Sequence, residues 1–121
     1  MCHRVWRSAA YGDLESLQRL SELSPRAIFS PDAQGYYALQ WAALNGRLAA
    51  LEWLLSRGVP IDSTDPSGQS ALHWAAVRGS LPCAEALLRA GAQLQAPDSR
   101  QYAPLHVAAQ YGQAAFIASL V

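Results

Sequence analysis

Two histidines are the residues of this sequence best suited to acid–base chemistry or metal binding. His73 and His106 lie 33 residues apart, and each stands between a leucine and a residue that precedes an alanine pair. Because the histidine recurs in equivalent surroundings, we expect a structural role for both, with each ring bonded to the backbone of a neighbouring turn. Gln40 occupies the position of a third histidine, and its amide can form similar hydrogen bonds. A catalytic histidine would not recur in this way.

The nucleophiles and carboxylates form no catalytic grouping either. Cys83 has no second cysteine or basic residue near it in the sequence, so we expect it to pack in the interior. Cys2, beside His3, is interpreted as part of a frayed terminus. Asp13 and Glu15 form an acidic pair on a helix surface, and the sequence has no glycine loop that would hold a phosphate. We therefore predict no catalytic site, no cofactor and no metal in this chain.

The composition is that of a folded protein without a strong electrostatic bias. The 121 residues are 51% hydrophobic, and 9 basic side chains balance 9 acidic ones. Because no net charge attracts phosphates, we do not expect nucleic acid as a partner. No apolar run approaches the roughly 20 residues that cross a bilayer, and no signal-peptide pattern opens the chain. We therefore expect this segment to be cytosolic, reduced and monomeric, without a membrane span.

A repeat of 33 residues organises the chain. The segment 38–46 (Ala-Leu-Gln-Trp-Ala-Ala-Leu-Asn-Gly) recurs at 71–79 and, with more changes, at 104–112. A weaker copy at 5–12 lies 34 residues before its counterpart, and we place the extra residue in the loop around Ser24-Pro25-Arg26. Four units follow from this pattern: residues 1–31, 32–64, 65–97 and 98–121.

Each unit has the pattern of a turn, a short helix, a sharp reversal and a longer helix. In the third unit Asp65-Pro66-Ser67-Gly68 has turn residues, and Ser70 is a suitable N-cap for a helix over 71–78. Gly79 ends that helix in the left-handed conformation, and Ser80 begins the next. Alanine pairs let inner helices approach closely, while leucine pairs fill the space between outer helices. We predict an all-α solenoid of about four helix-turn-helix units joined by β-turn or hairpin loops.

The fourth unit stops at Val121, within what we expect to be its outer helix. We therefore interpret the chain as a fragment whose last unit is truncated, with residues 115–120 exposed and without a partner. A cut unit that lacks a polar cap also predicts modest stability for the isolated chain.

The repeats resemble the ankyrin family over almost the entire chain. The phrases at 70–76 (Ser-Ala-Leu-His-Trp-Ala-Ala) and 103–109 (Ala-Pro-Leu-His-Val-Ala-Ala) are similar to the ankyrin signature Thr-Pro-Leu-His-x-Ala-Ala. A narrower resemblance, to the amino-terminal repeats of plant and algal ankyrin-repeat DHHC-type protein S-acyltransferases, depends most on Gly-Tyr-Tyr-Ala-Leu-Gln-Trp. The segments that carry it are 9–15, 35–41, 68–74 together with 77–79, and 106–112.

This narrower resemblance implies a function in protein palmitoylation. It implies a cytosolic ankyrin region that recruits palmitoylation substrates, followed by transmembrane helices and a cysteine-rich catalytic domain with Asp-His-His-Cys. None of that catalytic part is present in this sequence, so any palmitoyltransferase activity would lie outside it. The whole protein would then be an integral protein of the Golgi or other endomembranes. The alternative is a generic ankyrin adaptor with no associated enzyme.

The resemblance also implies a way of binding a partner protein or peptide on a concave face. In animal members of the family, an asparagine near the end of one inner helix and a tryptophan in the next grip an extended motif ending in Gln-Pro. These positions correspond to Asn45 and Trp74, whose amide and indole suit peptide backbone and a proline ring. For Trp74 a packing role remains an alternative, and Trp41 is interpreted as structural. The other candidate partner-binding residues lie at turn tips or late in inner helices: Gln34, Tyr36, Gln69, Arg78, Arg100, Tyr102 and Tyr111.

Overall fold

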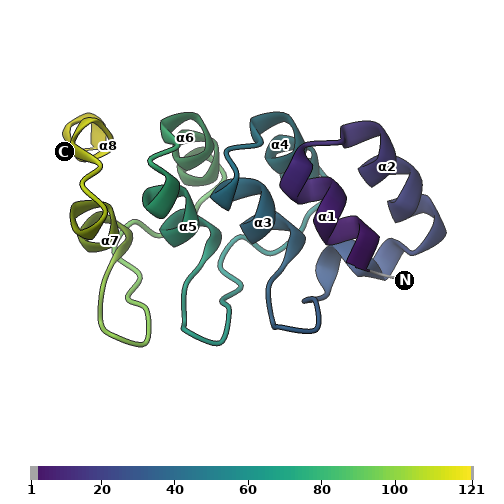
Figure 1. Cartoon of the computed structure of the whole chain (residues 1–121), viewed down its shortest axis with the longest axis horizontal. Helices are drawn as coiled ribbons and strands as arrows, with labels where there is room; N and C mark the ends of the chain where they lie inside the picture. The colour runs from purple at the N-terminus through teal and green to yellow at the C-terminus, as the bar shows by residue number, and fades with distance from the viewer. Residues whose placement is uncertain (1–2, 121) are drawn as a thin grey trace.

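Four pairs of helices stacked side by side make up the computed structural model, which describes residues 3–120 (Figure 1). The first helices of the pairs form an inner row: α1 (His3–Tyr11), α3 (Ala38–Leu44), α5 (Ala71–Arg78) and α7 (Pro104–Gln110). The second helices form an outer row: α2 (Leu14–Leu23), α4 (Leu48–Ser56), α6 (Leu81–Arg89) and α8 (Ala114–Leu120). Each inner helix contacts the next one along the row. The predicted all-α solenoid is confirmed, with no strand among residues 3–120; Cys2 lies outside the described residues.

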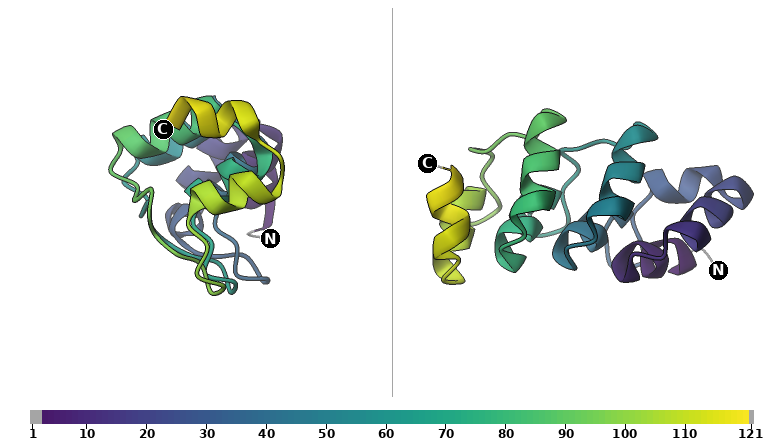
Figure 2. Two further views of the ribbon diagram at one scale, coloured as in Figure 1. Left: turned by 90° about the vertical axis from the view of Figure 1, so that its left-hand side faces the viewer. Right: turned by 90° about the horizontal axis from the view of Figure 1, so that it is seen from above.

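The turns between successive units project as hairpin tips to one side of the stack (Figures 1 and 2). In each tip the backbone N–H of an aspartate donates to the carbonyl four residues later, at 2.8 Å from Asp32 to Tyr36, 3.0 Å from Asp65 to Gln69 and 2.9 Å from Asp98 to Tyr102. A narrower turn closes inside each, as from Gly68 N–H to the Asp65 carbonyl at 2.9 Å. The three tips thus share one conformation, set by the period of the sequence.

Helix α5 begins and ends where the sequence predicts. Ser70 is its N-cap in extended backbone, and the Ser70 N–H donates to His73 Nδ1 at 3.1 Å. Gly79 follows in the left-handed region at φ 75°, where a side chain would be strained. Its N–H donates to the Ala75 carbonyl at 2.8 Å and satisfies one of the last open acceptors of the helix.

The core lies between the two rows of helices. Ala42, Ala43, Ala75 and Ala76 are fully buried, as their small size between close inner helices predicts. The leucine pairs of the outer helices divide instead, because a helix turns successive side chains apart by about 100°. The first member of each pair is fully buried and the second only partly: Leu54 and Leu87 against Leu55 and Leu88.

The structure corrects two expectations about the terminal units. The segment after α2 is a 3-10 helix, η1 (Pro25–Phe29), rather than an open loop, because Ala27 and Ile28 are buried there and belong to the core. In the last unit, Phe116 is not exposed: its side chain is only 2% exposed and belongs to the core. Its position corresponds, at the 33-residue period, to Cys83 on α6, which is also buried. Helix α8 therefore folds back on α7 and shields the end of the core.

Two further expectations can be compared with the described part of the chain. Cys83 is a free thiol with no exposed surface, which confirms its packing role, and burial raises its pKa. Within residues 3–120, no helix combines the length and the apolar character needed to cross a membrane. Histidine, cysteine and acidic side chains of the same residues form no group of three that could hold a metal ion.

Candidate partner-binding site

The tip aspartates fix the backbone on which the candidate binding residues stand. One carboxylate oxygen of each aspartate accepts two backbone N–H groups, from the residues two and four positions later. The bonds are Asp32 Oδ1 with Gln34 (2.9 Å) and Tyr36 (3.0 Å), Asp65 Oδ1 with Ser67 (2.9 Å) and Gln69 (3.0 Å), and Asp98 Oδ1 with Arg100 (2.8 Å) and Tyr102 (3.0 Å). Bonds to a charged acceptor are about twice as strong as neutral ones. Each tip is therefore a rigid platform rather than a loose loop.

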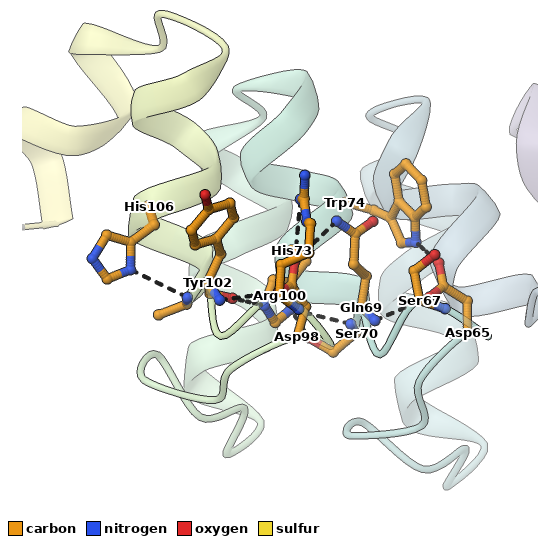
Figure 3. A network of polar contacts seen from close by, with 11 residues as sticks. Asp65, Ser67, Gln69, Ser70, His73, Trp74, Asp98, Arg100, Tyr102 and His106 are labelled. Atoms are coloured by element: carbon orange, nitrogen blue, oxygen red, sulfur yellow. Dashed lines mark hydrogen bonds and ion pairs between the residues drawn. The ribbon is translucent and has the colours of Figure 1, made fainter.

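The second carboxylate oxygen holds a tryptophan in the first two of these tips. Trp41 Nε1 donates to Asp32 Oδ2 at 2.9 Å. Trp74 Nε1 donates in the same way to Asp65 Oδ2 at 3.0 Å, as Figure 3 shows. Both indole rings are only partly buried, so the bond fixes the orientation of a ring that still faces solvent. The two tryptophans are thus positioned in the same way, one unit apart.

The third tip replaces the tryptophan with other donors. Val107 stands at the equivalent position of α7, and Asp98 Oδ2 accepts instead from Arg100 Nη2 at 3.2 Å and from Gln69 Nε2 at 3.4 Å (Figure 3). The Arg100 guanidinium also lies over the ring of Tyr102, 4.8 Å from its centroid. Hydrogen bonds from the backbone, from Arg100 and from Gln69 outweigh burial and lower the pKa of Asp98.

The histidine of the repeat signature has the structural role that the sequence predicts. His73 is fully buried; its Nδ1 accepts the Ser70 N–H, and its Nε2 lies 2.9 Å from the Tyr102 carbonyl (Figure 3). This pairing assigns the proton to Nε2, which donates to the next tip. Burial lowers the pKa of His73, so the ring is neutral at pH 7.

Gln40 forms the equivalent bonds one unit earlier. Its Oε1 accepts the Tyr37 N–H at 3.1 Å, and its Nε2 donates to the carbonyls of Ser63 at 2.9 Å and Gln69 at 3.2 Å. The expected exchange of histidine for an amide is therefore confirmed. In the last unit His106 is exposed, and among the described residues its ring keeps the local bond alone, from the Ala103 N–H to Nδ1 at 3.3 Å. The expected bond from this histidine to the backbone of a neighbouring turn is therefore not formed.

Three aromatic rings converge on a pocket between the second and third units. Tyr36 lies edge-to-face with Trp41 (centroids 5.8 Å apart, planes at 67°) and with Trp74 (6.0 Å and 72°). The pocket has a volume of about 280 Å³, and we call it the aromatic pocket. Its lining is Gln34, Tyr36, Gln40, Trp41, Leu44 and Trp74. The structure thus brings together three of the predicted binding residues, Gln34, Tyr36 and Trp74, and adds Trp41.

A second pocket, of about 370 Å³, lies one unit closer to the amino terminus, and we call it the asparagine pocket. Arg7, Tyr11, Asp32, Trp41 and Asn45 contribute to its lining. Asn45 Nδ2 donates to the Trp41 carbonyl at 3.0 Å, a bond that uses one of its N–H groups. Trp41 lines both pockets. Its place at the same repeat position as Trp74 is the sequence signal that would have marked it as a binding candidate.

The remaining predicted residues do not gather at these pockets. Gln69 is buried, with 8% of its surface exposed, and it holds Asp98, so it supports the tip rather than facing a partner. Arg100 and Tyr102 are engaged with each other. Arg78 is exposed at the end of α5, and Tyr111 lies 57% exposed just past α7.

Comparison with known proteins gives two matches. The family described as ankyrin repeats (3 copies) matches residues 5–98 and 39–121. Among curated proteins, the protein named "Probable protein S-acyltransferase 23" of Arabidopsis thaliana is 42% identical over 51 residues. The matched stretch covers 42% of this chain and 10% of that protein, so the chain corresponds to a small part of the relative's length.

Proposed function

The chain belongs to the ankyrin-repeat family, and on that premise we propose that it binds a protein partner on the side where the hairpin tips meet the inner helices. The observation that supports this proposal is the pair of adjacent pockets that share Trp41. Their aromatic walls are held by aspartates rather than left to rearrange, which lowers the entropy lost on binding. Tryptophan, tyrosine and arginine are the residues that most often anchor a protein interface.

We propose that the bound segment is an extended peptide that contacts both Asn45 and Trp74. Packed helices lie about 8–10 Å apart, and an extended chain rises about 3.3 Å per residue. Side chains about three positions apart would therefore reach the two pockets. The side-chain amide oxygen of Asn45, Oδ1, accepts no hydrogen bond from the described residues, so it suits a peptide N–H. Trp74 offers a ring of fixed orientation.

We further propose that the partner is a substrate of protein S-palmitoylation. Two observations support this: the similarity to an Arabidopsis S-acyltransferase and the Gly-Tyr-Tyr-Ala-Leu-Gln-Trp phrase at 35–41. The chain would then be the cytosolic recruiting region of a palmitoyltransferase in an endomembrane. The second candidate is an ankyrin adaptor without an enzyme, which the same pockets would serve equally well.

Peptide capture tests the binding proposal. The immobilised chain is offered extended peptides, including sequences that end in Gln-Pro, and the variants Asn45→Ala and Trp74→Ala are compared with it. We expect each variant to lose capture, whereas Glu52→Ala and Glu85→Ala, on exposed positions of the outer helices, retain it. Capture that is equal in all four variants would show that the assigned residues do not bind the peptide.

The coding sequence downstream of Val121 tests the palmitoylation proposal. Further repeats followed by apolar spans and an Asp-His-His-Cys segment would support it. An end shortly after a capping repeat would instead support the adaptor.

A further inference from the structure

The third tip shows how this fold places a cation on an aromatic ring. The Arg100 guanidinium stacks over Tyr102 and pairs with Asp98, at 4.8 Å from the ring centroid and 3.2 Å from the carboxylate (Figure 3). All three residues come from one turn, and the turn is fixed by the aspartate itself. A tip with Asp, Tyr and a cation in these positions is therefore a stable arrangement in this protein.

The first tip has the same aspartate and tyrosine but no cation. Asp32 and Tyr36 correspond to Asp98 and Tyr102 at intervals of 66 residues, two periods, while Gln34 stands in place of Arg100. Of the side chains that the structure describes, none forms an ion pair with Asp32. Arg7, across the asparagine pocket, is not within ion-pair distance of it. Gln34 and Tyr36, the counterparts of Arg100 and Tyr102, both line the aromatic pocket.

Two further rings line that opening, and each of them is bonded to a carboxylate. Trp41 and Trp74 stand nearly perpendicular to Tyr36, so the three rings wall the pocket from different directions. Asp32 and Asp65 accept the indole N–H groups, which places one negative charge at the edge of each indole ring, while neither carboxylate lines the pocket itself. Within the described part of the chain, Asp65 also forms no ion pair. The negative faces of aromatic rings and two nearby carboxylates both favour a positive ligand.

The pocket offers few free hydrogen-bond acceptors, and this decides which kind of cation it can bind. Gln40 already bonds through both its oxygen and its nitrogen, and both tryptophan N–H groups are occupied. Only the Gln34 amide and the Tyr36 hydroxyl remain to accept bonds. A primary ammonium carries three N–H donors and a guanidinium five, and burying donors without acceptors is costly. A quaternary ammonium group carries no N–H and avoids that cost.

We propose that the aromatic pocket binds a quaternary ammonium group, the trimethylated side chain of a lysine in the partner protein. The inference rests on the proposed function in taking the ligand to be part of a protein, and it names the side chain that would lie against Trp74. A proline ring would gain the apolar contact with Trp74 but nothing from the two carboxylates. Charge, rather than shape, therefore distinguishes the two ligands.

A pair of small molecules of equal shape tests this distinction. Choline carries a trimethylammonium head, and 3,3-dimethylbutan-1-ol carries a neutral tert-butyl group of the same shape. Titration of the 121-residue chain is followed by the NMR shifts of the ligand methyl groups, which aromatic rings move upfield. We expect choline to bind roughly tenfold more tightly than the neutral alcohol. Equal affinity for the two, or no shift of the choline methyl groups, would overturn the proposal.

Three variants locate the binding. Tyr36→Leu removes one wall while the Asp32 bonds to the backbone remain, and we expect at least a roughly fivefold loss of choline affinity. Gln34→Arg places in the first tip the cation that Arg100 supplies in the third, and we expect it to fill the pocket and abolish choline binding. Trp53→Leu is the matched control, because Trp53 lies on α4 outside the pocket. Choline binding that survives Gln34→Arg but fails in Trp53→Leu would place the site elsewhere and refute the assignment.

Two peptides of the same sequence, one with an unmodified lysine and one with a trimethylated lysine, test the proposal with a peptide ligand. We expect the chain to bind the trimethylated form at least roughly tenfold more tightly, and Gln34→Arg to remove the difference. Equal binding of the two peptides would refute the lysine assignment. Asn45→Ala separates this proposal from the general one. Because Asn45 does not line the aromatic pocket, we expect this variant to weaken peptide capture and to leave choline binding unchanged.

Discussion

Replacing Asp65 with asparagine tests whether the tip aspartates hold the tryptophans that wall the pocket. Asp65 Oδ1 accepts two backbone N–H groups, and Oδ2 accepts the Trp74 indole. In Asp65→Asn the amide oxygen can keep the two backbone bonds, but its NH₂ group then faces the indole N–H. One charge-assisted bond is lost and two donors oppose each other, so we expect a loss of about 1.5–3 kcal/mol in the free energy of unfolding.

The cost should depend on Trp74, which a double-mutant cycle measures by urea unfolding. In a Trp74→Phe background no indole donor remains, so Asp65→Asn should cost less there by about 1–2 kcal/mol. Asp32→Asn and Trp41→Phe form the matched pair of the preceding unit, with the same bonds. We expect the coupling within each pair to exceed the coupling across the pairs, where Trp41 and Trp74 interact through their common neighbour Tyr36.

Additive effects of Asp65→Asn and Trp74→Phe would refute the reasoning. They would mean that the indole is not held by the carboxylate in solution, and that the pocket wall is mobile. Coupling of equal size in the crossed pairs would also contradict it, since it would indicate a general loss of packing rather than a specific bond.

Three further predictions follow from burial. Because burial lowers the pKa of His73 below its ordinary value of 6.5, the unfolded chain takes up the proton first as pH falls. Stability should therefore be complete above about pH 6.5 and decrease below it until the folded pKa is passed, by at most about 1.4 kcal/mol per pH unit. His73→Gln, which copies Gln40, should fold and flatten this decrease in urea titrations at several pH values. Phe116→Ala should lower the free energy of unfolding by about 3–5 kcal/mol, whereas the exposed Ala118→Gly should cost only about 1 kcal/mol; equal costs would contradict the burial of Phe116. Cys83 should react with a thiol reagent only as fast as the chain opens, and rapid labelling under native conditions would contradict its burial.

The period of the sequence determined how much of the fold was predictable. Once the repeat is recognised, Ser70, Gly79 and the buried His73 are placed by their positions in it, and the structure agrees at each. The burial of Phe116 does not follow from the interpretation of the last helix as exposed. The same 33-residue period relates Phe116 to the buried Cys83 and would have predicted its burial.

The site was less predictable, because its bonds join residues whose partners differ between units. The sequence marks Gln69, Arg100 and Tyr102 as surface residues at turn tips, and position alone gives no reason to exclude them. In the structure Gln69 is buried and donates a hydrogen bond to Asp98, and the Arg100 guanidinium lies over the Tyr102 ring. These contacts depend on Val107, which leaves Asp98 without the indole donor that the earlier aspartates have.

Two positions of each unit therefore decide whether an arginine covers its tip or a tryptophan ring lies beside it. Two residues after the aspartate stand Gln34, Ser67 and Arg100; nine residues after it stand Trp41, Trp74 and Val107. Where arginine and valine occur together, the arginine satisfies the carboxylate and covers the tyrosine. Where an uncharged residue and tryptophan occur together, the indole satisfies the carboxylate and its ring lines the aromatic pocket. Because the backbone bonds to the aspartate are the same in the three tips, exchanging these two residues should cover Tyr36 in the first tip and uncover Tyr102 in the third without rebuilding the fold.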